Sequence, residues 1–297
     1  LASIGVCSGV QFVFYRHALS SAPRALELLL KKKFKRQVVS SLLNAMAAPF
    51  DPKTLIEVRS SRPPALWVEE AATACMHDSF QALVTAPLSK TAIVNAGLKD
   101  IGHTEILSRL SQQKDLFMGF FGKQFSVVLA TGHSPLARAI IEFSPSRLTR
   151  AIAAAERLRS ILPPRQAALP LALVGLNPHA GESGLIGKDE IWLTKLVRDL
   201  STSIDIVGPL VPDAAFLPPN WKRHSVYICP YHDQGLIPFK MVHGFDSGVH
   251  VTLGLPFVRT SVDHGTAKDL FGKNKAEHGS MKDALRVAIR LSKEWKK

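Results

Sequence analysis

Short apolar runs alternate with amphipathic segments along most of this 297-residue chain. Runs of this length, without polar alternation, are typical of strands buried on both faces of a sheet. Strands that alternate with helices favour an α/β fold with a largely parallel sheet. The pattern predicts strands at 11–15, 81–85, 125–130, 169–176 and 225–229, and helices at 23–33, 64–77, 89–96, 146–158, 190–200 and 281–295.

Three of the predicted strands are followed within a few residues by a histidine. These residues are His133, His179 and His232. In α/β folds, ligands bind at the carboxyl ends of the strands, and three imidazoles there suit a divalent transition metal with open coordination positions. A single histidine in such a position is more often an ordinary hydrogen-bonded polar residue, and the spacing matches no local metal motif, but three repeats of the same placement favour a metal site. His103 and His264 extend the same pattern.

The stretch 231–267 concentrates ionisable residues in largely apolar sequence that we predict to be rich in β-structure. It holds four His, three Asp, one Lys and one Arg. Because burial of unpaired charge is costly, a chain that needed only a core would not place them there. Arg259 suits bidentate recognition of a carboxylate or phosphate. Lys240 is open to two interpretations, a site residue or a surface lysine.

A glycine-rich loop at 177–187 precedes a predicted helix. Such a loop can present backbone N–H groups to an anion. It lacks the Gly-Lys-Ser/Thr of a Walker loop and is not a GxGxxG fingerprint.

Charge and composition limit the partners. The net charge of +13 favours anionic partners, but the chain has no recognisable nucleic-acid module and no interleaved stacking aromatics. No apolar run approaches the length of a membrane span, and the first fifteen residues lack the basic region of a signal peptide. Three widely spaced cysteines fit neither a disulfide framework nor a metal site. We therefore expect a cytoplasmic protein that binds neither nucleic acid nor membrane.

Several motifs in one order resemble the 4-hydroxythreonine-4-phosphate dehydrogenase family of pyridoxal phosphate biosynthesis. They cover essentially the whole chain and comprise residues 84–90 (VTAPLSK), 102–105 (GHTE), 176–182 (LNPHAGE), 212–216 (PDAAF), 231–235 (YHDQG) and 260–267 (TSVDHGTA).

The resemblance implies a two-domain fold like that of the isocitrate and isopropylmalate dehydrogenases, in a homodimer with a shared active site. Residues 1–100 plus 261–297 would form the first α/β domain, and residues 101–260 the second, which carries most ligands.

The resemblance also assigns roles to individual residues. The implied metal ligands are His133, His179 and His232, the last from the partner subunit; the substrate contacts are His103, Thr104, Lys240, His250 and Arg259; the catalytic residues are Lys240 and His232; the cofactor contacts are His264, Gly265, Thr266 and Ala267.

The implied reaction is oxidation of a secondary alcohol of 4-phosphohydroxy-L-threonine by NAD or NADP, followed by loss of CO2. The product would be 3-amino-2-oxopropyl phosphate. A divalent metal, Zn, Mg or Co, would act as a Lewis acid on the forming ketone.

The chain departs from the family pattern in three places. His250 stands where the family usually has Asn, and Thr131-Gly132 where Thr-Thr is common. The family also opens with a strand and a Gly-Asp-Pro-type loop, whereas this chain begins at Leu1 with neither. We therefore expect a chain that is missing its first strand and loop and is less stable and less active than a longer version.

Three alternatives remain open at this point. The first is a dehydrogenase of D-threonate or D-erythronate 4-phosphate, which the change at His250 keeps open. The second is a zinc hydrolase, in which a metal held by three histidines activates water. The third is a truncated, inactive paralogue that still folds and dimerises.

Overall fold

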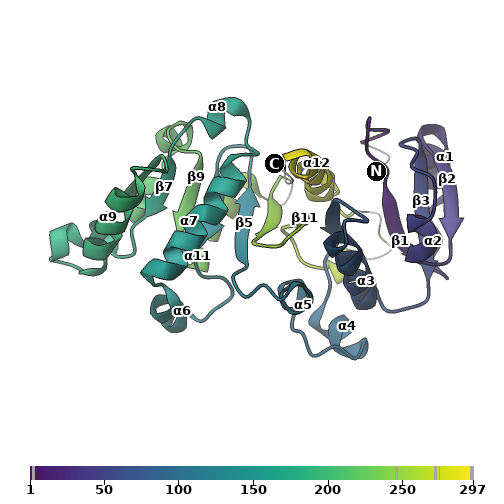
Figure 1. The fold of residues 1–297 in the computed structure, drawn as a ribbon, viewed down its shortest axis with the longest axis horizontal. Helices are drawn as coiled ribbons and strands as arrows, with labels where there is room; N and C mark the ends of the chain where they lie inside the picture. Colours follow the sequence, from purple (N-terminus) through teal and green to yellow (C-terminus); the bar gives the residue numbers. More distant parts are fainter. Residues whose placement is uncertain (2–3, 245–246, 271–272, 274, 295–297) are drawn as a thin grey trace.

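The computed structural model describes residues 1, 4–244, 247–270, 273 and 275–294. The molecule is elongated, with a small sheet at one end and a large sheet filling the rest (Figure 1). The small sheet has the strand order β1-β3-β2, and all of its pairs are parallel. Its strands are β1 (Val13–His17), β2 (Lys35–Val39) and β3 (Thr54–Ser60).

The large sheet has eight strands in the order β4-β11-β10-β5-β6-β9-β7-β8. Pairs at both ends are parallel, and the three central pairs that involve β10 and β5 are antiparallel. The mixed helices and strands and the mainly parallel pairing confirm the predicted fold class. The strands are β4 (Ala82–Thr85), β5 (Phe117–Phe121), β6 (Ser126–Leu129), β7 (Leu171–Val174), β8 (Ile206–Leu210), β9 (Val226–Cys229), β10 (Val249–Leu253) and β11 (Val258–Val262).

Alternate residues of the central strands build two separate cores, because successive side chains of a strand point to opposite faces. Val128 and Ile228 belong to the core under α7 (Pro145–Arg159), α9 (Asp189–Leu200) and α12 (Gly279–Glu294). Val127 and Tyr227 belong to the core under α11 (His232–His243). The sheet is thus buried on both faces, which explains the continuous apolar runs in the sequence.

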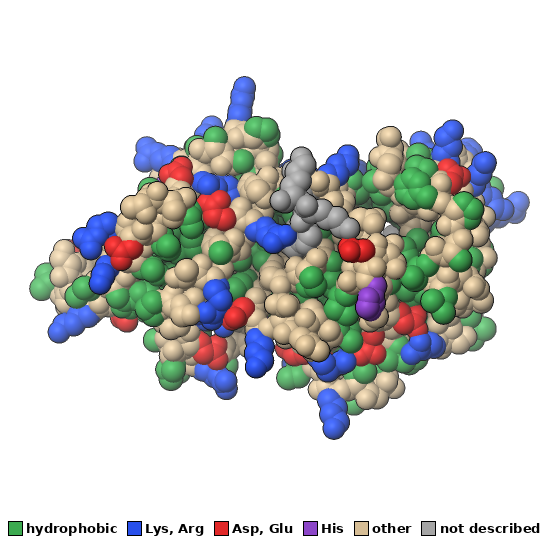
Figure 2. Space-filling view, viewed as in Figure 1, with side chains coloured by type: hydrophobic (Ala, Val, Ile, Leu, Met, Phe, Trp, Pro, Cys, Tyr) green, Lys and Arg blue, Asp and Glu red, His purple; other side chains and the backbone are tan. Residues whose placement is uncertain are grey.

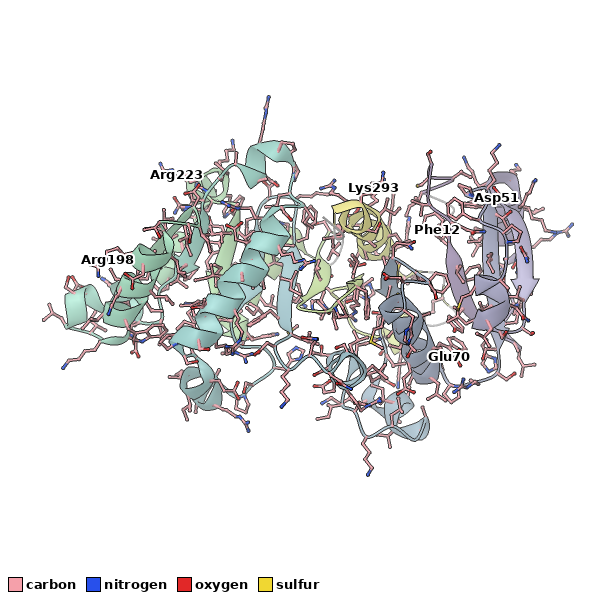
Figure 3. All side chains as sticks on the ribbon, viewed as in Figure 1. Phe12, Asp51, Glu70, Arg198, Arg223 and Lys293 are labelled. Carbon is pink, nitrogen blue, oxygen red and sulfur yellow. The ribbon has the colours of Figure 1, made fainter. Side chains whose placement is uncertain are left out.

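Two helices join the small sheet to the large one. On α3 (Pro64–Met76), Trp67 stacks on Tyr15 of β1 with 5.4 Å between ring centroids, and Glu70 accepts a 2.7 Å hydrogen bond from the same tyrosine. Helix α12, which also covers β11 and β4, contributes apolar side chains to the core around Phe12. Figure 3 shows Phe12 and Glu70 on the side of the small sheet that faces the rest of the molecule. In the described chain, β1 and β4 are edge strands with one strand neighbour each.

The remaining helices are short connections. They are α1 (Arg24–Lys33), α2 (Leu42–Met46), α4 (Lys90–Asn95), α5 (His103–Ser111), α6 (Leu136–Glu142), α8 (Pro164–Ala167) and α10 (Pro212–Ala215), and the 3-10 segments η1 (Pro178–Gly184), η2 (Pro218–Lys222) and η3 (Lys268–Leu270).

The predicted elements are all present, with shifts of a few residues at their ends; Trp295, at the end of the last predicted helix, lies outside the described residues. Several elements were not predicted, namely the helices α2, α5, α6, α8, α10 and α11 and the strands β2, β3, β5 and β8. The start of the stretch expected to be β-rich is α11, and Gly235 and Pro238 inside it disguise the helix. Gly235 lets α11 approach the sheet closely, since a Cβ there would lie 2.8 Å from Leu129 and 3.0 Å from the sulfur of Cys229.

Ser280 is the second residue of α12 and contacts the sheet rather than capping the helix. The helix begins at Gly279, and the Ser280 hydroxyl donates to the Gly248 carbonyl at 2.8 Å. Its side chain therefore ties α12 to the start of β10.

Lysine and arginine side chains are spread around the visible face rather than gathered into one basic patch (Figure 2). None of the described helices is both long and apolar enough to span a membrane.

Candidate active site

The three histidines predicted at strand ends follow three neighbouring strands. His133 follows β6, His232 follows β9 and His179 follows β7, and these strands are adjacent and parallel in the order β6-β9-β7. All three residues therefore lie at one edge of the sheet, as the sequence pattern predicted.

His133 and His232 come together because the pairing of β6 with β9 continues beyond the strands. Ala130 N–H donates to the Cys229 carbonyl at 2.8 Å, and Thr131 N–H to the Pro230 carbonyl at 3.2 Å. The two imidazole rings that follow have centroids 5.0 Å apart. The resemblance led us to expect His232 from the partner subunit, but here its ring lies beside His133 of the same chain.

The surroundings of the two imidazole rings suit metal binding. Burial, and then the neighbouring His232, lower the pKa of His133, which keeps it in the neutral form that binds metals. Nδ1 of His232 lies 2.6 Å from a carboxylate oxygen of Asp233, which leaves Nε2 for a ligand. A carboxylate behind a ligating histidine is a common arrangement at metal sites. The pair thus fits part of the coordination shell of a divalent ion.

His179 stands apart from this pair. Its side chain is 65% exposed, and its Nδ1 lies 3.3 Å from Glu182. It lies in a left-handed turn in which even the non-glycine residues have positive φ angles. Among the described residues, no group of three His, Cys, Asp or Glu side chains surrounds one metal position.

The glycine-rich loop does not present its first donors to an external anion. The N–H groups of Leu176 and Asn177 both donate to one carboxylate oxygen of Glu190, at 2.9 and 2.7 Å. Glu190, the buried second residue of α9, therefore already occupies the position that we had considered for a ligand.

A cavity of about 550 Å³ opens beside the histidine pair. It brings together five of the predicted site residues, and adds Asp263, which the sequence analysis had not assigned to the site. Its lining residues are Met118, Phe120, His133, His232, Asp233, Leu236, Ile237, Lys240, His250, Val262, Asp263 and His264.

Behind one wall of the cavity lies the buried cation of Arg259, which is only 2% exposed. Its guanidinium donates to the hydroxyls of Thr252 at 2.9 Å and Thr85 at 2.7 Å, and to Nδ1 of His250 at 3.0 Å. Burial lowers its pKa to about 10, so it remains charged near neutral pH. No carboxylate of the described residues forms an ion pair with it, so the site carries an uncompensated positive charge.

His103 is the first residue of α5, and its imidazole is a second one near Arg259, besides that of His250. Burial, and then the charge of Arg259, lower the pKa of His103 to about 3, so its ring is neutral. Its electrostatic coupling to both Arg259 and His250 places all three near one another. Thr104 is the next residue of the same helix turn.

Lys240 and Asp263 also line the cavity. The Lys240 ammonium donates to the backbone carbonyl of Asp263 at 3.1 Å. Burial raises the pKa of the Asp263 carboxyl, and its buried Oδ2 atom has no hydrogen-bond partner among the described residues. The sequence signal that could have assigned Asp263 to the site is its position directly before His264. The predicted cofactor residues, His264 to Ala267, continue from there into a mostly exposed loop whose first member lines the cavity.

Fold and site together define an α/β enzyme with a cationic, histidine-rich pocket at the edge of its sheet. Solved structures share this fold: 4-hydroxythreonine-4-phosphate dehydrogenase from Klebsiella pneumoniae superimposes with a TM-score of 0.73 and 28% identity, over 96% of this chain and 90% of that one.

Curated relatives agree with the structural match. The 4-hydroxythreonine-4-phosphate dehydrogenases of Methylococcus capsulatus and Aquifex aeolicus are each 39% identical to this chain. The alignments cover 76% and 77% of this chain and 68% and 71% of those proteins, respectively. The profile of the family described as pyridoxal phosphate biosynthetic protein PdxA matches residues 27–288. The chain belongs to this family, as its motifs indicated, and is an oxidoreductase of the 4-hydroxythreonine-4-phosphate dehydrogenase type.

Proposed function

We propose that this protein oxidises and decarboxylates 4-phosphohydroxy-L-threonine to 3-amino-2-oxopropyl phosphate, with NAD or NADP as oxidant. The observation that carries the proposal is Arg259, a buried cation without a carboxylate partner among the described residues. An uncompensated buried charge is unfavourable unless a ligand of opposite sign completes the site. An anionic, phosphorylated hydroxy acid meets this requirement.

In this reaction, the carbon that bears the hydroxyl gives a hydride to the nicotinamide, and the hydroxyl proton passes to a base. The resulting β-keto acid loses CO2, and the carbon left behind takes up a proton. A divalent metal, Zn, Mg or Co, held by His133 and His232, would supply Lewis-acid stabilisation of negative charge on oxygen. We assign the proton transfers to Lys240, whose ammonium donates to the backbone carbonyl of Asp263, and to the Asp263 carboxyl, whose pKa is raised.

The remaining site assignments follow from the same arrangement. His103, Thr104, His250 and Arg259 would hold the substrate anion, and residues His264 to Ala267 would contact the cofactor. We retain the division into residues 1–100 plus 261–297 and residues 101–260 as a proposal. We also propose a cytoplasmic location, which the three free cysteines support, because unpaired thiols are typical of reducing compartments.

The test is to follow the absorbance of reduced cofactor with three substrates in parallel. They are 4-phosphohydroxy-L-threonine, D-threonate 4-phosphate and D-erythronate 4-phosphate, each with NAD and with NADP. We expect the first to give the highest kcat/KM. Preference for either of the others would support the alternative that His250 suggested, and metal binding without any cofactor reduction would support an inactive paralogue.

Arg259→Met should raise the KM for the phosphorylated substrate about 100-fold, because charge-assisted hydrogen bonds contribute on the order of 2–3 kcal/mol. Methionine keeps much of the side-chain volume but removes the charge. The matched control is Arg198→Met on α9, far from the cavity and labelled in Figure 3, which should have parental kinetics. Parental KM in Arg259→Met, with an unchanged melting temperature, would remove Arg259 from the site.

We further propose a homodimer in which His179 of the partner subunit completes the site. Large apolar side chains are exposed beside the cavity and the His179 loop, namely Ile237 and Met241 on α11, Ile141 on α6, and Leu185. Exposed apolar clusters of this kind are typical of protein interfaces. His179, exposed and outside the same-chain pair, is then available to a second copy.

Mixing two inactive variants, His179→Ala and His232→Ala, tests the shared site. In a heterodimer, one site has His133 and His232 from the first chain and His179 from the second, and is intact. After complete exchange, half of the dimers are mixed and half of their sites are intact, so about a quarter of parental activity should return. Verified exchange with no recovery would show that all ligands come from one chain.

A further inference from the structure

A buried hydroxyl joins the two strand ends that carry His133 and His232. Thr131 is 0% exposed, and its Oγ1 donates to the Pro230 carbonyl at 2.8 Å. The same carbonyl accepts the Thr131 N–H at 3.2 Å. One residue of β6 therefore supplies a donor to each lone pair of one carbonyl oxygen after β9. We call this double hydrogen bond the Thr131 clasp.

The clasp lies at the same distance along the chain from both imidazoles. His133 follows Thr131 by two residues, and His232 follows Pro230 by two residues. Two residues of extended chain span at most about 7 Å, so a short segment connects each ring to the clasp. A change in the spacing of the clasped backbones therefore passes to the rings, whose centroids are 5.0 Å apart.

A second side chain holds the end of β6 from its other side. The Ala130 carbonyl accepts a 2.6 Å hydrogen bond from Nε of Arg147, which lies in the first turn of α7. The guanidinium lies over the Phe117 ring, 5.5 Å from its centroid. The backbone before His133 is thus fixed to α7 through Ala130 and to the chain after β9 through Thr131.

The hydroxyl does more than satisfy the Pro230 carbonyl, because the Thr131 N–H already donates to that oxygen. Its particular contribution is a close contact. A hydroxyl that donates can lie 2.8 Å from the carbonyl oxygen, whereas a carbon atom in the same place stays about 3.3–3.6 Å away. Valine has the shape of threonine without the hydroxyl, so it would move the two strand ends apart by about 0.5 Å or more.

We propose that Thr131 is a positioning residue that holds His133 and His232 at the separation at which both can bind one divalent metal ion. The inference rests on the proposed function for the metal, and on the hydrogen bonds alone for the clasp. Outer-shell groups at metal sites typically contribute 10- to 100-fold to metal affinity. Because Thr131 acts through the backbone rather than on a ligand directly, we expect the lower end, about 10-fold.

Three variants separate the hydroxyl from the rest of the side chain. Thr131→Val removes the hydroxyl and keeps the shape, whereas Thr131→Ser keeps the hydroxyl and removes the methyl group. Thr260→Val is the matched control, because Thr260 is also 0% exposed and its hydroxyl donates to the Ala284 carbonyl at 2.9 Å. Thr260 lies on β11, which β10 and β5 separate from β6. The control should lower the melting temperature about as much as Thr131→Val without changing metal binding.

Titration of metal-free protein with Co²⁺, followed by the ligand-field absorption of the ion, measures both affinity and coordination geometry. The Kd for Co²⁺ should rise about 10-fold in Thr131→Val, with an altered spectrum, and stay within about 2-fold of the parent in Thr131→Ser and Thr260→Val. Parental affinity and spectrum in Thr131→Val would overturn the proposal. Equal losses of affinity in Thr131→Val and Thr131→Ser would also overturn it, since the hydroxyl would then not be the cause.

Crystal structures of the metal-free proteins give a readout that needs no metal. The separation of the His133 and His232 ring centroids, 5.0 Å in the parent, should increase in Thr131→Val and keep its parental value in Thr131→Ser. An unchanged separation in Thr131→Val contradicts the proposal. If the separation responds as expected but the parent protein binds no divalent metal, the proposed metal chemistry fails and the positioning role of Thr131 stands.

Discussion

His232→Ala and His133→Ala should each lower kcat about a thousand-fold and abolish tight binding of a divalent metal. The two imidazoles lie together at the sheet edge, with centroids 5.0 Å apart. Loss of one ligand removes the Lewis acid from the site, and such stabilisation is worth several kcal/mol, or about 4 kcal/mol for a thousand-fold change. Metal content after dialysis, measured together with steady-state rates, checks both effects.

The control for this experiment is His77→Ala, since His77 is an exposed histidine at the end of α3. It should keep both metal content and rate. Treatment of the parent protein with a chelator should reproduce the loss of activity, and added Zn, Mg or Co should restore it. Unchanged metal stoichiometry in both His133→Ala and His232→Ala would refute the assignment.

The free energy of unfolding should fall between pH 7.5 and pH 5.0, with about 2 kcal/mol of the loss due to His103. Burial lowers the pKa of His103 to about 3 and holds that of His250 well below its ordinary value. In the unfolded chain both residues bind protons below about pH 6.5, whereas in the folded chain they remain neutral. The unfolded state therefore binds more protons, so stability is lost as the pH falls from 6.5 toward the folded pKa values, by about 2 kcal/mol for His103 at pH 5.0.

Urea unfolding at several pH values measures this dependence. His103→Gln should remove the contribution of His103, about 2 kcal/mol between pH 7.5 and 5.0, because glutamine does not titrate. His77→Gln, at an exposed position, should leave the slope unchanged. A flat profile between pH 7.5 and 5.0 would mean that the buried rings are protonated in the folded protein.

Much of the fold could be predicted because buried parallel strands appear in the sequence as short, continuous apolar runs. The runs at β6, β7 and β9 are buried at every position, and the helices between them have apolar faces. Helix α11 escaped prediction because Gly235 and Pro238 oppose a helix locally, and only the packing of Gly235 against Leu129 explains its presence. Local propensity was overridden by a tertiary contact that the sequence does not display.

The sequence predicted which residues form the site but not which of them contact one another. Three histidines after strands could be assigned to one sheet edge, since β6, β9 and β7 obey the ordinary rule for parallel sheets. The close approach of His133 and His232 depends on strand neighbours, and neighbours in the sheet are not neighbours in the chain. The absence of a carboxylate partner for Arg259 among the described residues, and the buried carboxyl of Asp263, are likewise properties of the folded protein alone.

The separation of the two sheets has a consequence for cooperativity. In the described chain no strand ladder joins β1 to β4, so the small sheet is held to the large one through the side chains of α3 and α12. Side-chain contacts of this kind can be lost together without breaking a backbone hydrogen bond in either sheet. Residues of the small sheet therefore form a unit that can open before the rest of the molecule unfolds, while the histidine pocket, built on the large sheet, keeps its geometry.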